Sequence, residues 1–196
     1  IMMRDNTSLN VVATSGDYGG IYFNERGTNT VDVVMRDYAK IVAHDLSVRF
    51  NNASGTFLMR DYSTIVANSR AVYLNYGAMN FTMNDPDDAT DDGYASIKVN
   101  NNGGNGFMFT NTARNARLIM NKNALIEGNT VTAADGGGVV FTSNSNNNSA
   151  TDTVGNYLEM KDNSRVTGFR NGIYLHKGCY PMNITMEDNA SVDQNY

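Results

Sequence analysis

Aspartate recurs at one fixed place along this chain, and regularly spaced carboxylates suit calcium binding or acid–base catalysis. The recurring residues each stand two positions after a methionine: Asp5, Asp37, Asp61, Asp85, Asp162 and Asp188. If equivalent residues stack, their carboxylates lie about 4.8 Å apart and repel one another unless a proton, a cation or a base compensates. We expect these residues to cap backbone amides at a corner, and calcium binding is the alternative.

A denser acidic group occupies a short segment that also contains Pro86 and Gly93. Its members are Asp85, Asp87, Asp88, Asp91 and Asp92. We interpret this segment as a solvated acidic loop, with calcium binding as the alternative. No two carboxylates are set apart as a glycosidase pair, and neither His44 nor His176 accompanies a nucleophile. The sequence therefore predicts no catalytic site and no cofactor, with calcium left open.

The methionines that precede the aspartates define a sevenfold internal repeat. Each ends a short apolar-x-Met run, and the series is Met3, Met35, Met59, Met83, Met120, Met160 and Met186. An aliphatic residue follows six positions later, as Leu9, Ile41, Ile65, Ile126, Val166 and Val192, with Ala89 or Ile97 in the irregular fourth copy. Such a period indicates stacked, equivalent supersecondary units.

A third apolar run follows in six of the copies and is often preceded by glycine. These runs are residues 21–23, 48–50, 72–74, 107–109, 139–141 and 173–175. The shortest unit, from Met35 to Met59, is 24 residues long, which suits three short strands with tight corners. Polar or glycine-rich insertions lengthen other units at residues 10–19, 87–105, 128–135 and 142–155.

These features predict an all-β chain folded as a β-solenoid of about seven three-strand coils with loop insertions. The abundance of asparagine and glycine agrees with this fold, because both residues tolerate the left-handed backbone of tight corners. We expect residues 1–196 to form a single β-solenoid domain, which is either a fragment of a longer rod or a stacking subunit with open ends.

Charge and apolar content argue against two classes of partner. The formal net charge is −5, the sequence pI is about 4.9, and no basic run could neutralise phosphates, so nucleic-acid binding is not expected. No stretch approaches the roughly 18 apolar residues of a membrane-spanning segment. The single cysteine, Cys179, has no partner for an internal disulfide and lies in no metal-binding motif.

One segment carries a family resemblance. Residues 123–130 read Asn-Ala-Leu-Ile-Glu-Gly-Asn-Thr, and the Gly-Gly-Gly-Val-Val-Phe run follows at 136–141. Residues 163–168 and 171–175 repeat this theme. The pattern resembles polymorphic outer-membrane-protein and autotransporter-type passenger repeats, within the wider pectin-lyase-like fold. This resemblance implies a right-handed parallel β-helix; such folds host lyases, hydrolases, adhesins and fibres alike.

Strand alternation predicts two outward-facing columns of side chains. The third run of each copy gives Tyr22, Arg49, Tyr73, Met108, Val140 and Tyr174, and the first run gives a column that includes Val34, Leu58 and Ile119. A column of exposed aromatic and aliphatic side chains on a flat sheet indicates either a lateral contact or cover by inserted loops.

We therefore expect a non-catalytic structural or adhesive β-solenoid that is extracellular or at a bacterial cell surface. Its expected partners are copies of itself, associating end to end or laterally into a fibre, or host and cell-surface glycans or proteins. End-to-end contact is expected because the chain begins and ends on strands without a polar cap. The alternative is a carbohydrate-active enzyme, either a polysaccharide lyase or a hydrolase, in which charged residues of adjacent coils converge in a groove.

Overall fold

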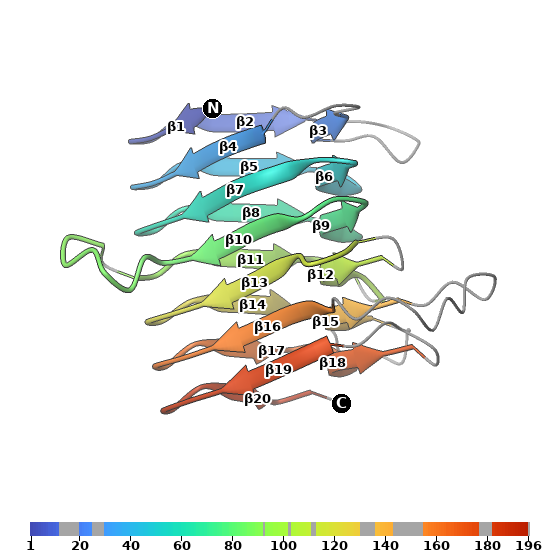
Figure 1. The fold of residues 1–196 in the computed structure, drawn as a ribbon. Helices are drawn as coiled ribbons and strands as arrows, with labels where there is room; N and C mark the ends of the chain where they lie inside the picture. The colour runs from blue at the N-terminus through green and yellow to red at the C-terminus, as the bar shows by residue number, and fades with distance from the viewer. Residues whose placement is uncertain are drawn as a thin grey trace.

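The computed structural model describes residues 1–11, 20–24, 30–91, 93–101, 103–110, 113–129, 136–142, 155–176 and 182–195. Within these ranges the chain is all-β, and its strands form three parallel sheets that stack along one axis (Figure 1). Successive coils lie next to one another in sequence order from the N-terminus to the C-terminus. The chain is therefore a β-solenoid, as the repeat predicts.

The first sheet holds the strand of each repeat that ends in methionine. Its order is β1 (Met2–Met3), β4 (Thr30–Met35), β7 (Ser54–Met59), β10 (Met79–Met83), β13 (Arg117–Met120), β16 (Asn156–Met160) and β19 (Met182–Met186). The pairing register places all seven repeat methionines in one column. Its five middle members are fully buried, which confirms that these positions build the core.

The second sheet holds the aliphatic partner of each methionine. Its order is β2 (Ser8–Val11), β5 (Lys40–Ala43), β8 (Thr64–Ala67), β11 (Ser96–Val99), β14 (Leu125–Gly128), β17 (Arg165–Thr167) and β20 (Ser191–Asp193). In the irregular fourth coil Ile97 pairs with Ile65 and Ile126, whereas Ala89 is exposed. The expected insertion over residues 87–105 is therefore divided in two by β11.

The third sheet has one strand fewer, as the sequence predicts. Its strands are β3 (Ile21–Asn24), β6 (Leu46–Asn51), β9 (Arg70–Asn75), β12 (Asn105–Phe109), β15 (Gly137–Phe141) and β18 (Asn171–Leu175). Parallel crossovers of this kind are right-handed in nearly all proteins. The right-handed sense of winding stays a prediction on that basis.

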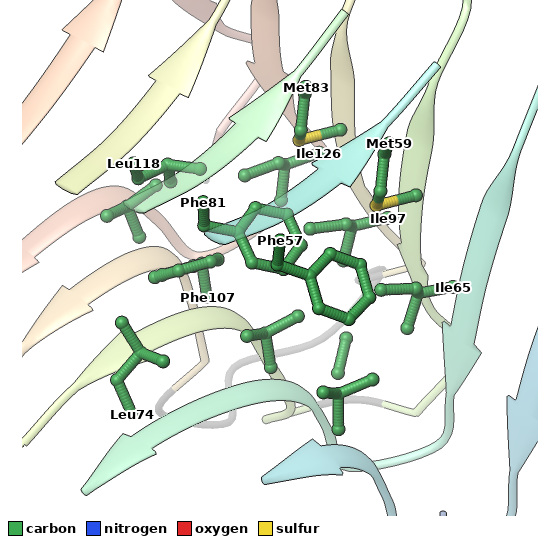
Figure 2. Close-up of a cluster of buried hydrophobic side chains, with 14 of the residues drawn as sticks. Phe57, Met59, Ile65, Leu74, Phe81, Met83, Ile97, Phe107, Leu118 and Ile126 are labelled. Atoms are coloured by element: carbon green, nitrogen blue, oxygen red, sulfur yellow. The ribbon is translucent and has the colours of Figure 1, made fainter. Parts of the chain in front are cut away.

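Apolar side chains from all three sheets meet in a narrow central column (Figure 2). Phe57 and Phe81 stack within the first sheet, with ring centroids 4.6 Å apart and an angle of 7° between the rings. Phe107 of the third sheet meets Phe81 nearly edge-on at 5.0 Å and 78°. Because equivalent residues lie on top of one another, each layer of the core repeats the packing of the last.

Glycine is required where the second and third sheets approach each other most closely. A Cβ on Gly106 would lie 2.4 Å from Cγ2 of Ile126, and one on Gly138 would lie 2.2 Å from Cγ1 of Val166. Both distances are far shorter than van der Waals contact, so a larger side chain would force the sheets apart. This contact explains why glycine so often precedes the third apolar run.

Candidate binding surfaces

The recurring aspartates lie at the corner between the first and second sheets, which we call the first corner. The backbone there is left-handed, with φ between 56° and 58° at Asp5, Asp37, Asp61, Asp162 and Asp188. Lys122 has the same conformation in the fifth coil, with a φ of 55°. Aspartate adopts this region more readily than most side chains, so the residue type agrees with the local geometry.

Carboxylates at the first corner accept hydrogen bonds from backbone N–H groups one coil earlier. The amide of Asp5 donates to Oδ2 of Asp37 at 3.1 Å, and the amide of Asp37 donates to Oδ2 of Asp61 at 3.0 Å. The amide of Lys122 donates in the same way to Oδ2 of Asp162 at 2.8 Å. We call this series the aspartate ladder. The prediction that these residues cap backbone amides is confirmed, although each capped amide belongs to the neighbouring coil.

Hydrogen bonding in the ladder also affects carboxylate ionisation. The hydrogen bond from the Asp5 amide, assisted by the nearby Arg36 side chain, lowers the pKa of Asp37 below its usual value. The amide hydrogen bond therefore favours the charged form of the Asp37 carboxylate.

The fourth coil departs from the ladder because an insertion enters at its first corner. Gly93, with a φ of 76°, takes the corner position, and its carbonyl accepts the N–H of Asn123 at 2.9 Å. The carboxylate comes instead from Asp91, whose Oδ1 accepts the amide of Asp61 at 2.9 Å and whose Oδ2 accepts that of Asp85 at 2.6 Å. The expectation that Asp85 continues the column is wrong, because the insertion moves it away from the corner and Asp91 takes over.

Cations from the two neighbouring coils hold this acidic insertion. Arg60 forms an ion pair with Asp88, and its Nε lies 3.8 Å from Oδ2 of the fully buried Asp91 side chain. Nζ of Lys122 donates to the carbonyls of Asp88 and Asp91 at 2.8 and 2.9 Å. Hydrogen bonds from the Thr90 hydroxyl and amide, helped by Arg60, lower the pKa of Asp88 to about 2. The interpretation as a solvated loop is therefore wrong for Asp91, which is buried to complete the ladder.

Other ionisable residues that the structure describes form ion pairs, such as those of Lys161 with Glu159 and Glu187, at 2.7 and 3.5 Å. Among the described residues, no three histidine, cysteine, aspartate or glutamate side chains are grouped so that they could hold a metal ion. His44 is exposed, and the ring of His176 meets the edge of Tyr174 with centroids 4.6 Å apart. Asp92 and Cys179 lie outside the described residues. Calcium binding stays a prediction.

A stack of tyrosines runs beside the aspartate ladder. Tyr38, Tyr62 and Tyr94 each follow the corner residue of their coil, and their rings stack at centroid distances of 5.1 and 5.3 Å, within 8° of parallel. They are 60, 39 and 50% exposed. We call these three residues the tyrosine ladder. Asparagines occupy the same row in later coils, where Asn189 donates to Oδ1 of Asn163 at 3.2 Å.

The predicted outward column of the third sheet is formed in register. Its paired members are Tyr22, Arg49, Tyr73, Met108, Val140 and Tyr174. The guanidinium of Arg49 lies between two rings, 5.4 Å from the centroid of Tyr22 and 5.3 Å from that of Tyr73. Cation–π contact on both faces gives this part of the column a defined shape. We call this group of three residues the Tyr–Arg–Tyr cluster.

One member of this column is fully buried, whereas Tyr22 and Tyr174 are exposed and Arg49, Tyr73 and Met108 are half-buried. Val140 has 1% of its surface accessible, so the expectation that it faces outward to solvent is wrong. The physical reason is the neighbouring Gly137, because a Cβ there would lie only 2.5 Å from Cγ2 of Val140 and 3.3 Å from Cβ of Tyr174. The valine side chain therefore fills the space that glycine leaves open, and Tyr174 is its partner on the next strand.

The predicted outward column of the first sheet is also formed. Val34 pairs with Leu58, and Ile119 lies two strands further on, beyond Thr82. All of these side chains are half-buried. The column is therefore only partly accessible to solvent.

The last strand layer leaves apolar side chains accessible at the axial edge of the described residues. Leu175, Ile184 and Met186 are 47, 38 and 43% exposed, although their equivalents in earlier coils lie in the core. Parallel strands exposed in this way present both apolar surface and backbone hydrogen-bonding groups.

Comparison with known proteins found no matching family model, no matching curated protein and no matching solved structure. The assignment as a β-solenoid rests on the strand order and register of the chain itself. No described residue lies in a helix, so that part of the chain has no apolar helix long enough to cross a membrane.

Proposed function

We propose that this chain is a non-catalytic structural or adhesive β-solenoid that acts outside the cell or at a bacterial cell surface. The family that we propose is that of polymorphic outer-membrane-protein and autotransporter-type passenger domains, within the pectin-lyase-like group. The Gly-Asn-Thr and Gly-Gly-apolar patterns at residues 123–130 and 136–141 support this proposal, together with the three-sheet solenoid that they help to build.

The observation that carries the proposal is the repetition of exposed aromatic side chains along the rod. The tyrosine ladder and the Tyr–Arg–Tyr cluster each span three successive coils. Tyrosine supplies a large, amphipathic contact area at low entropic cost, and it is enriched at sites of recognition for that reason. An array of such side chains suits contact with an extended partner, such as a surface glycan or protein.

A binding assay with matched variants tests this proposal. We expect the purified chain to adhere to cell-surface polysaccharide or protein preparations without degrading them. The variants Tyr38→Ser/Tyr94→Ser and Tyr22→Ser/Tyr73→Ser each remove one aromatic surface, and at least one of them should abolish adhesion. The control Lys40→Ser/Lys98→Ser alters the second sheet and should adhere as the wild type does.

Two outcomes would overturn the proposal. The first is reproducible cleavage of a polysaccharide by the purified chain that a single substitution, such as Asp61→Asn, abolishes; that result would establish the enzyme alternative. The second is wild-type adhesion by both tyrosine variants combined, which would remove the aromatic surfaces from the binding site.

Self-association is the second part of the proposal, and it is supported by the exposed apolar edge of the last strand layer. Ile184→Lys/Met186→Lys places charge on that edge while leaving the inner coils unchanged. If copies stack axially, electron microscopy should show filaments for the wild type and none for the variant. A wild type that stays monomeric at high concentration would contradict this part.

A further inference from the structure

The tyrosine ladder holds three phenol rings in a stack on the surface of the rod. Tyr38, Tyr62 and Tyr94 come from three successive coils, and both ring-to-ring contacts are within 8° of parallel. The ring centroids of Tyr38 and Tyr62 are 5.1 Å apart, and those of Tyr62 and Tyr94 are 5.3 Å apart. Each residue is at least 39% exposed, so the edge of the stack is open to small molecules in solution.

The backbone imposes this ring spacing. The N–H of each ladder tyrosine donates to the carbonyl of a corner residue one coil earlier, at 2.8–3.0 Å: Tyr38 to Asp5, Tyr62 to Asp37 and Tyr94 to Asp61. Each tyrosine also directly follows a corner residue with a left-handed backbone, which is an aspartate or Gly93. The three side chains therefore leave equivalent corners in the same direction, and the rise of the solenoid, about 4.8 Å per coil, sets the distance between their rings.

Phenol rings stacked in this way are suited to oxidative coupling. A one-electron oxidant removes an electron and the hydroxyl proton from tyrosine and leaves a phenoxyl radical, whose unpaired spin lies partly on the ring carbons ortho to the oxygen. Two such radicals form a carbon–carbon bond between ortho carbons, and the two ring hydrogens at that bond move to the phenol oxygens. With hydrogen peroxide and a haem peroxidase as the oxidant, two tyrosines and one peroxide give one dityrosine and two waters.

The ladder makes this coupling intramolecular. The rings of each pair are already neighbours, so bond formation needs rotation of the side chains and no encounter between separate chains. Reacting groups held together in this way couple far faster than the same groups on separate molecules in dilute solution. The Tyr–Arg–Tyr cluster lacks this arrangement, because the guanidinium of Arg49 lies between the rings of Tyr22 and Tyr73.

We infer that the tyrosine ladder is a site of oxidative cross-linking, where a dityrosine bond joins Tyr62 to Tyr38 or to Tyr94 and ties neighbouring coils together covalently. The sequence contains a single cysteine, so no internal disulfide supplies such a link. The cross-link closes a loop of the chain, and it therefore restricts the unfolded state as a disulfide does. This inference is independent of the proposed adhesive function.

Peptide mapping after oxidation tests the inference. The full chain, at low concentration, is treated with a haem peroxidase and hydrogen peroxide, and the monomeric fraction is isolated in denaturant and digested with trypsin. Lysine and arginine residues lie between the three tyrosines, so trypsin places them in different peptides. Mass spectrometry should find the Tyr62 peptide joined to that of Tyr38 or Tyr94, each pair lighter by two hydrogen atoms than the sum of its parts.

Phenylalanine variants keep the rings and remove the reactive phenols. Tyr62→Phe should abolish both cross-links, because Tyr38 and Tyr94 lie two coils apart. Tyr38→Phe should keep only the bond between Tyr62 and Tyr94. The control Tyr22→Phe/Tyr73→Phe removes two phenols from the third sheet and should form the ladder cross-links to the same extent as the wild type. Circular dichroism of each unoxidised protein checks that the solenoid is kept.

Urea unfolding measures whether the bond restrains the coils. The cross-linked wild type should unfold at a higher urea concentration than before oxidation, whereas Tyr62→Phe should unfold at the same concentration before and after the treatment. The inference would be overturned by dityrosine that forms only between separate chains or only at other tyrosines, by its absence from the oxidised wild type, or by a wild-type yield in Tyr62→Phe. An unchanged midpoint in the cross-linked chain would also overturn it.

Discussion

Two buried serines have different surroundings in this fold. Oγ of Ser47 donates to the carbonyl of Val66 at 2.6 Å, whereas Oγ of Ser63 has no hydrogen-bond partner among the described residues. Ala39 is the equivalent of Ser63 in the preceding coil, because the backbone carbonyl of each residue accepts an N–H from the next coil. Burial of a hydroxyl is therefore compensated at one site and uncompensated at the other.

Replacing each serine by alanine should have opposite effects. Ser47→Ala should lower the free energy of unfolding by about 1 kcal/mol, because the Val66 carbonyl loses its donor. Ser63→Ala should leave it unchanged or raise it by up to about 1 kcal/mol, because an unsatisfied hydroxyl is removed. Urea unfolding measures both values. A larger loss for Ser63→Ala than for Ser47→Ala would contradict the assignment.

Asp88 makes part of the stability depend on pH. Its pKa is lowered to about 2 from 3.8, so the stabilisation is fully present above pH 3.8 and is lost as the pH falls through about 2. Asp88→Asn should therefore flatten the fall in stability over this window, as followed by thermal melting. Asp87→Asn, in the same insertion, is the charge-matched control. Parallel curves for Asp88→Asn and the wild type would rule out this contribution.

At the scale of the strands and corners, the sequence predicted the pairing register of the strands more completely than the residues that form the corners. The Met and aliphatic positions align as the repeat requires, because core residues at equivalent depth are constrained to the same type. The place of Asp85 was predicted wrongly, because nothing in the local pattern shows that a later residue folds back. Asp91 could be identified only once the path of the insertion was known.

A substitution at Asp91 gives the strongest test of how that insertion is held in place. Its buried carboxylate accepts three amides, those of Asp61, Asp85 and Gly93, the last at 2.8 Å. Asp91→Ala should therefore cost about 3 kcal/mol of unfolding free energy, because the three amides lose their acceptor and Arg60 loses an ion-pair partner.

The matched control for this substitution is Asp87→Ala, which removes an exposed carboxylate from the same loop and should change stability by less than about 0.5 kcal/mol. Chemical denaturation compares the two variants. If they unfold at the same denaturant concentration, Asp91 does not hold the loop.

At the scale of the whole molecule, each coil contacts only its neighbours, so stability is distributed along one dimension. Met59 lies in a middle coil and is fully buried, whereas Met186 occupies the equivalent place in the last layer and is 43% exposed. Met59→Ala should cost about 2–5 kcal/mol, and Met186→Ala should cost less than about 1 kcal/mol.

Hydrogen exchange provides the measurement for these two methionines. Amides of β19 and β20 should exchange faster than those of β7 and β8, because opening the last layer breaks contacts on one side only. Uniform exchange along the rod, or equal losses for the two alanine variants, would show that the coils unfold as a single unit.

Alternation along the strands predicted the outward columns but not the surfaces between them. Val140 could not be recognised as buried, because its close packing on Gly137 arises only in the folded chain. The tyrosine ladder did leave a signal, since Met-Arg-Asp-Tyr occurs at both 35–38 and 59–62.

The aspartate ladder makes the two ends of the rod different from each other. Every rung runs from an amide to a carboxylate in the following coil, so the first described layer presents the acceptor Asp5 and the last presents the donor N–H of Asp188. Two copies that meet head to tail would match acceptor with donor and complete one more rung. A head-to-head contact would instead set two carboxylates against each other. Any axial assembly of this chain should therefore be polar, with all subunits pointing the same way.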